Sequence, residues 1–139
     1  MPAIELLLVS PPDYQTREFR GAQPLGIAYL AATLREQGNI TCQLLDANAP
    51  AAPGAGVGSP MSMDELTSRV VRFIETSKSA GGHPVIGFSA VSQVMRTCAQ
   101  IAERIKAAHP DTLVIVGGYH PTFAHREILE DFPAIDMCV

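Results

Sequence analysis

The sequence contains no tryptophan, no Cys-x-x-Cys pair and no run of lysine or arginine residues. It has no basic runs and a formal net charge of −4 at pH 7, so it lacks the clustered positive charge that is typical of nucleic-acid-binding proteins. The three cysteines, Cys42, Cys98 and Cys138, are widely spaced, which argues against a disulfide framework, a zinc site or an iron–sulfur cluster within this chain. We expect all three to be buried free thiols.

Long apolar runs are missing as well. The mostly apolar stretch at residues 4–9 is too short for a membrane span or a signal peptide, and no basic segment precedes it. We therefore expect a cytoplasmic protein with neither a membrane nor a nucleic acid as its partner.

Several nucleotide-binding and catalytic motifs are absent. There is no Gly-x-x-x-x-Gly-Lys phosphate loop, no Gly-x-Gly-x-x-Gly after the first predicted strand and no Gly-x-Ser-x-Gly elbow. Gly54, Gly56 and Gly58 lie in an Ala-, Pro- and Gly-rich stretch at residues 47–61, which we interpret as a loop. These glycines are therefore spacers rather than a phosphate-binding motif.

What the sequence does contain is a regular alternation of strand and helix patterns in a length that suits one domain. The patterns predict strands at residues 4–10, 40–45, 84–88, 112–116 and 135–139, and helices at residues 24–38, 62–80, 95–108 and 121–132. Alternation of this kind is typical of parallel strands joined by right-handed crossovers. We predict a three-layer α/β fold with a doubly wound, Rossmann-like or flavodoxin-like five-stranded sheet in the order 2-1-3-4-5. No helix pattern follows the last strand, so we expect residues 1–139 to be an N-terminal domain of a longer protein.

In such a sheet, ligands bind beyond the carboxyl ends of the strands, where the strand order reverses. That point lies between the first and third strands, next to the loops at residues 10–23 and 89–93 and to the residues Gly117 to His120. The Gly117-Gly118 pair has two interpretations, a tight turn that needs positive φ or the close approach of a large flat ligand. Arg17 and Arg20 are candidates for binding an anion.

Five stretches together resemble the N-terminal cobalamin-binding domain of cobalamin-dependent radical SAM enzymes: LLLVSPP, PLGIAYLAATLREQG, LLDAN, VIGFSAV and VIVGGYHPT. The resemblance implies a cobalamin at the carboxyl edge of the sheet, its nucleotide tail in a groove beside the third and fourth strands, and a hydrogen bond from Ser89 to the base of the tail. The cofactor-binding residues that we expect are Pro12, Asp13, Tyr14, Gln15, Ser89, Ala90, Val91, Gly117, Gly118, Tyr119 and His120.

The same resemblance implies a partner that the 139 residues do not include. In the family, a downstream catalytic barrel of the same chain carries a 4Fe-4S cluster and S-adenosylmethionine. The parent protein would then be a radical SAM methyltransferase or cyclase, whereas this chain alone would bind cobalamin and catalyse nothing.

The first loop departs from a pattern found in cobalamin mutases and methionine synthase. Those relatives carry Asp-x-His-x-x-Gly after the first strand, and its histidine ligates cobalt, whereas residues 10–24 here contain no histidine. The resemblance therefore implies base-off cobalamin without a histidine ligand, with Tyr14 or Gln15 as the neighbour of the metal.

Two other functions remain open at this point. A module that has kept the fold and lost cobalamin, serving as a structural or substrate-binding domain, is compatible with the missing histidine. A flavin-binding domain fits less well, because Pro11 and Pro12 replace the Ser/Thr-rich phosphate turn and no tryptophan is present to flank the flavin.

Overall fold

The computed structural model describes residues 3–15, 23–49 and 58–139. The elements are β1 (Ile4–Ser10), α1 (Leu25–Glu36), β2 (Ile40–Asp46), α2 (Met63–Ser79), β3 (His83–Ser89), a 3₁₀ turn η1 (Ser92–Val94), α3 (Met95–Ala108), β4 (Leu113–Gly117), α4 (Tyr119–Asp131) and β5 (Met137–Cys138). All strand pairs are parallel, and the order β2-β1-β3-β4-β5 confirms the predicted doubly wound sheet.

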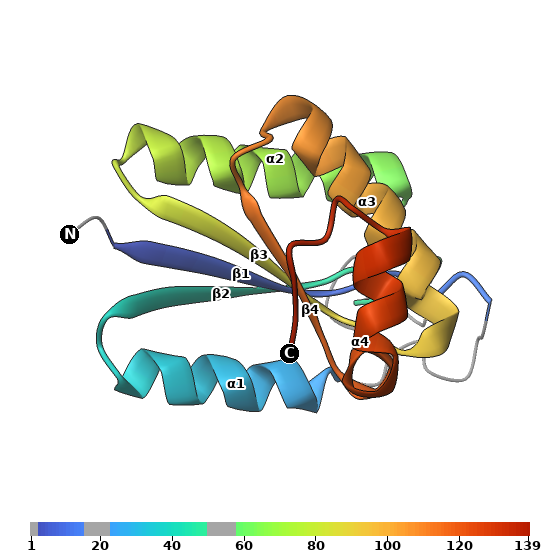
Figure 1. The fold of residues 1–139 in the computed structure, drawn as a ribbon. Coiled ribbons are helices and arrows are strands. Elements are labelled where there is room, and N and C mark those ends of the chain that lie inside the picture. Colours follow the sequence, from blue (N-terminus) through green and yellow to red (C-terminus); the bar gives the residue numbers. More distant parts are fainter. Residues whose placement is uncertain (1–2, 16–22, 50–57) are drawn as a thin grey trace.

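The sheet lies between two helical layers (Figure 1). Helix α1 packs on β1 and β2 from one face, while α2, α3 and α4 cover the other face. Alternate residues of β1 serve the two layers: Leu7 and Val9 join the larger core under α2 and α3, whereas Leu8 joins a smaller core with Ile27 and Ala31 of α1. The face that carries α1 is thus the more thinly covered of the two.

The last strand is shorter than the pattern at residues 135–139 predicts. The Asp136 carboxylate accepts the Val114 backbone N–H at 2.7 Å and forms an ion pair with Lys106 at 2.7 Å. A side chain therefore takes up the Val114 N–H, while the Val114 carbonyl accepts the Asp136 backbone N–H at 2.9 Å. Paired strand residues begin at Met137, opposite Ile115.

Helix α4 begins at Tyr119, two residues before the predicted start, and its backbone leaves helical geometry at Ala124 (φ −118°, ψ 23°). Pro121 is tolerated because it lies in the first turn, where its missing N–H has no partner within the helix. The early start brings Tyr119 and His120 into the helix rather than into the preceding loop.

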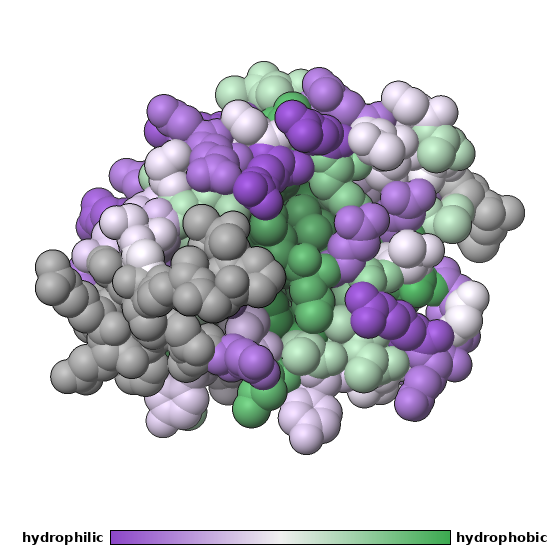
Figure 2. Space-filling view, turned by 180° about the vertical axis from the view of Figure 1, so that it is seen from behind, coloured by the Kyte–Doolittle hydropathy of each residue, from purple (hydrophilic) through white to green (hydrophobic). Residues whose placement is uncertain are grey.

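Apolar and polar surfaces are separated as a three-layer fold requires. Seen from the side opposite to Figure 1, the molecule carries a central apolar stripe between polar margins (Figure 2). Within the described residues, no helix is both long and apolar enough to cross a bilayer.

The cysteines are free thiols, as expected, but only two of them are buried. Cys42 and Cys98 lie in the cores, and burial raises the pKa of the Cys98 thiol to about 12. Cys138, on the short edge strand β5, is half-buried, which corrects the prediction for this residue.

Candidate functional site

The loops that follow β1, β3 and β4 all begin at the carboxyl edge of the sheet. Strands β1 and β3 are neighbours, and the helices that follow them lie on opposite faces, so the strand order reverses between them. Backbone hydrogen bonds join the last two loops, because the Ala90 N–H donates to the Gly117 carbonyl at 2.8 Å and the His120 N–H to the Ala90 carbonyl at 3.4 Å. Two of the three predicted segments, those after β3 and β4, are therefore joined, whereas Tyr14 of the loop after β1 is bonded to Met61.

An apolar cavity of about 420 Å³ opens beside this edge, between α1 and the face of β1, β3 and β4 that α1 only partly covers. Its size falls within the range of about 300–1,000 Å³ that is usual for small-molecule sites. The lining residues are Leu6, Leu8, Gly26, Ile27, Leu30, Thr33, Leu34, Gly87, Phe88, Ser89, Ile115, Gly117, Gly118 and Val139. Three of the predicted site residues, Ser89, Gly117 and Gly118, thus belong to the cavity.

The two glycines have different reasons to be glycine. A Cβ atom on Gly117 would be in ordinary contact with Val139, 3.6 Å from its carbonyl oxygen and 3.7 Å from its Cβ, so Val139 borders this part of the cavity and a small side chain would be tolerated. Gly118 has φ +114°, and a Cβ there would lie only 2.9 Å from the Ala90 carbonyl oxygen. The turn interpretation therefore explains Gly118, and the close-approach interpretation remains for Gly117.

The residues at and after the end of β3 differ in burial and in their contact with the cavity. Ser89, at the end of β3, is exposed and presents a hydroxyl at the cavity lining, whereas Ala90 is fully buried and contributes backbone to the junction with Gly118. Val91 is exposed. Beyond it, the Ser92 hydroxyl lies 3.0 Å from Nδ1 of His120, so a side-chain hydrogen bond ties the two loops in addition to the backbone bonds.

Tyr14, in the described part of the loop after β1, lies elsewhere. The Tyr14 hydroxyl donates to the Met61 carbonyl at 2.8 Å, beside the ion pair of Asp64 and Arg104 on α2 and α3. Burial raises the pKa of the Tyr14 phenol, and the nearby Arg104 opposes the rise. Tyr14 is therefore on the α2–α3 side of the sheet, away from the cavity under α1.

The other predicted residues of this loop fix its shape. Pro12 is buried, and the Asp13 carboxylate accepts the Gln15 backbone N–H at 2.9 Å. Gln15 is the last described residue of this loop. Arg17 and Arg20 lie outside the described residues, as do Gly54 and Gly56 of the second loop.

Asn48 is a site residue that the sequence analysis does not single out. Its amide Nδ2 donates to the Pro11 carbonyl at 2.8 Å, and its Oδ1 accepts the Asp13 N–H at 2.8 Å. One side chain thereby holds the loop after β1 against the loop after β2. Its place two residues after the strand-ending Asp46 in LLDAN is the signal that could have identified it.

Asn48→Ala is expected to lower the free energy of unfolding by about 1–3 kcal/mol, because it leaves two half-buried backbone groups without their partner. Urea unfolding followed by circular dichroism measures the change. Asn39→Ala, in the exposed turn before β2, serves as the control and should stay within about 0.5 kcal/mol of the wild type. Equal stability of the two variants would contradict the role of Asn48.

Helix α1 also contributes more to the site than its sequence indicates. Its apolar residues include Leu25 and Leu30, yet these are 59% and 56% exposed, while Ile27 and Ala31 are buried. Leu30 lines the cavity together with Leu34, so part of the apolar stripe faces an open space instead of a core. The apolar periodicity alone could not separate these two environments.

The described histidines and acidic groups are the candidate ligands for a metal ion. Among the described residues, no group of three His, Cys, Asp or Glu side chains could hold a metal ion. All four histidines are described: His83 and His109 lie at the amino edge of the sheet, His125 lies within α4, and His120 is at the carboxyl edge. Only His120 is therefore near the candidate site.

Comparison with known proteins identifies a family. The model of the B12 binding domain matches residues 21–139. An uncharacterized methyltransferase of Pyrococcus horikoshii is 24% identical over 142 residues, which cover 100% of this chain and 27% of that protein. An anaerobic magnesium-protoporphyrin IX monomethyl ester cyclase of Rubrivivax gelatinosus is 26% identical over 116 residues, which cover 84% of this chain and 18% of that protein.

The chain thus spans about a quarter or less of the length of these relatives. The family match covers every strand except β1 and includes each residue of the cavity lining except Leu6 and Leu8. The confirmed strand order agrees with the fold expected from the resemblance to cobalamin-binding domains. The chain belongs to the B12-binding domain family.

Proposed function

We propose that the chain binds cobalamin at the carboxyl edge of the sheet, with the nucleotide tail in the cavity between α1 and the strands β1, β3 and β4. The cavity supports this proposal: it is largely apolar, it lies at the point of strand reversal, and it carries the Ser89 hydroxyl. A flat benzimidazole base needs apolar walls and a polar group that fixes its orientation. Gly117 lines this cavity at the end of β4.

Titration of the chain with hydroxocobalamin tests the proposal. We expect a one-to-one complex, detected as heat in calorimetry and as a change in the visible absorbance of the corrin. An absence of both signals would favour a module that has kept the fold and lost cobalamin.

Within this proposal, cobalamin is bound base-off and without a histidine ligand. The described part of the first loop presents Asp13, Tyr14 and Gln15, of which Tyr14 is engaged with Met61 on the other side of the sheet. Gln15 is accordingly the better of the two candidates for a neighbour of the metal. His120 has one ring nitrogen occupied by Ser92 and stands at the end of β4, where it contributes to holding the loops.

His120→Ala is expected to leave the visible spectrum of bound cobalamin unchanged, because the imidazole is not a ligand of the metal in this proposal. Ser89→Ala, by contrast, should weaken binding about threefold to tenfold, since one hydrogen bond contributes about 0.5–1.5 kcal/mol. Absorbance titration measures both effects. A spectral shift caused by His120→Ala alone would mean that His120 ligates the metal.

We further propose that the domain works with a catalytic barrel of the same parent chain, which carries the 4Fe-4S cluster and S-adenosylmethionine. The names of the two relatives, a methyltransferase and a cyclase, and their greater length support this view. Bound cobalamin supplies a cobalt centre suited to methyl transfer or radical chemistry. The residues of this chain supply the binding surface: the apolar cavity holds the tail, and the joined loops after β3 and β4 support the macrocycle.

A further inference from the structure

Two aromatic side chains stand together on the surface of the first part of α4, which follows Gly118 of the cavity lining. Tyr119 is 76% exposed and Phe123 is 73% exposed, and their rings pack edge to face with 5.3 Å between centroids. Large aromatic residues usually gain free energy from burial, so a pair that packs on itself and on little else is typical of a binding surface.

Helical spacing explains why this pair cannot reach the core. Tyr119 and Phe123 are four residues apart and share one face of the first segment of α4. Pro121, between them on another face, is buried, and so is Ile128 further along the helix. Pro121 and Ile128 therefore lie on the side of α4 that packs against the core, and the aromatic pair lies on another side.

The pair also stands on a firmly held part of the chain. The Thr122 hydroxyl and the Thr122 N–H both bond to the Gly118 carbonyl, at 2.8 Å and 3.2 Å. The His120 backbone and ring bond to Ala90 and to Ser92, respectively. These contacts fix the first turn of α4 directly next to Gly117 and Gly118, which line the cavity.

We infer that Tyr119 and Phe123 form a platform for the corrin macrocycle of the ligand; this inference rests on the proposed cobalamin function. The cavity takes a group the size of the nucleotide tail, so the macrocycle must stay outside it, at the rim. The rim next to Gly118 is where the aromatic pair begins. A corrin presents methyl groups and a broad unsaturated ring, and both make favourable contacts with aromatic faces and edges.

Titrations with two ligands separate this inference from the proposed function. Cobinamide carries the corrin but lacks the nucleotide tail, so it depends on the platform and not on the cavity. For the Tyr119→Ala/Phe123→Ala double variant, we expect about a tenfold loss of affinity, or about 1.4 kcal/mol, for cobinamide and for cobalamin alike. Both replaced residues are exposed, so the variant should fold as the wild type does.

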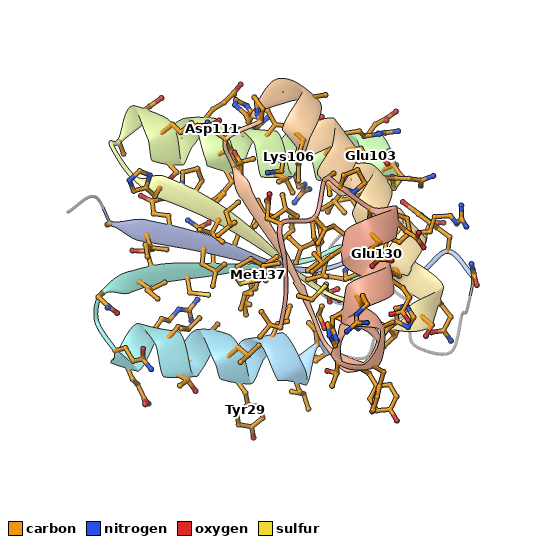
Figure 3. All side chains as sticks on the ribbon, viewed as in Figure 1. Tyr29, Glu103, Lys106, Asp111, Glu130 and Met137 are labelled. Carbon is orange, nitrogen blue, oxygen red and sulfur yellow. The ribbon has the colours of Figure 1, made fainter. Side chains whose placement is uncertain are left out.

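Tyr29→Ala is the matched control. Tyr29 is 74% exposed, and its side chain extends from α1 away from the sheet (Figure 3). Its replacement should change neither affinity by more than about twofold.

Three results would overturn the inference: unchanged affinity of the double variant for both ligands, an equal loss in Tyr29→Ala, or no binding of cobinamide to the wild type. If cobalamin also fails to bind the wild type, the proposed function is overturned as well. If cobalamin binds normally to the wild type and to the double variant, only the platform is wrong.

Discussion

Gly117→Leu is expected to lower the affinity for cobalamin about tenfold to hundredfold while the chain still folds. The new side chain would project from β4 into the cavity, where a Cβ meets nothing closer than 3.6 Å. Filling a space that a ligand group needs costs about 1–3 kcal/mol, as overpacking does in protein cores. Calorimetric titration with cobalamin measures the loss, and circular dichroism shows whether the secondary structure is retained.

Gly26→Leu fills the same cavity from the opposite wall, on α1, and should have a similar effect. No atom lies within 4 Å of a Cβ at this position, so the substitution introduces no clash. Ala32→Leu, on an exposed position of the same helix outside the cavity lining, is the matched control and should bind cobalamin as the wild type does. Undiminished binding by both glycine variants would show that the ligand does not occupy this cavity.

Gly118→Ala is expected to lower the free energy of unfolding by about 3 kcal/mol or more. At φ +114° and ψ −165° the backbone is in a region that essentially only glycine occupies, which costs another residue about 1–3 kcal/mol. The added Cβ would in addition lie 2.9 Å from the Ala90 carbonyl oxygen, and that backbone atom cannot move without breaking the junction of the two loops. Urea unfolding measures the change.

Gly26→Ala is the control for this second experiment. It adds the same methyl group at a helical glycine with open space, so stability should stay constant or rise by up to about 1 kcal/mol. A Gly118→Ala variant as stable as the wild type would mean that the turn can relax. Because replacing Gly118 is expected to lower stability, binding of cobalamin is tested separately with the Gly117→Leu and Gly26→Leu variants.

The fold could be predicted because its signal is local and repeated. Continuous apolar runs such as residues 4–10 alternate with helical periodicity, and parallel pairing with right-handed crossovers leaves few arrangements. The predicted helix at residues 24–38 is only slightly too long: Pro24 is the N-cap of α1, and Gly38, with φ +75°, lies just after the C-cap Gln37. The weakest prediction was the fifth strand, where Asp136 competes with the backbone for Val114.

The candidate site was only partly predictable, because its details depend on contacts between distant residues. Ser89 and Gly117 do line the cavity, and strand order alone was enough to place them. Tyr14 faces the other side because of a hydrogen bond to Met61, 47 residues away, and no local pattern encodes such a bond. The role of Asn48 also depends on distant contacts, because both hydrogen-bond partners of its side chain lie in the loop after β1, so no local pattern predicts these bonds.

The junction between Ala90 and the segment from Gly117 to His120 has a consequence for protein engineering. Its hydrogen bonds along the main chain involve backbone atoms alone, so exchanging the exposed side chains of Val91 or Tyr119 leaves these bonds in place. The support is also preorganised, which reduces the entropy that a ligand must spend on ordering it. Under the proposed cobalamin function, libraries that vary only these outward positions would search for new macrocycle preferences while the backbone junction is preserved.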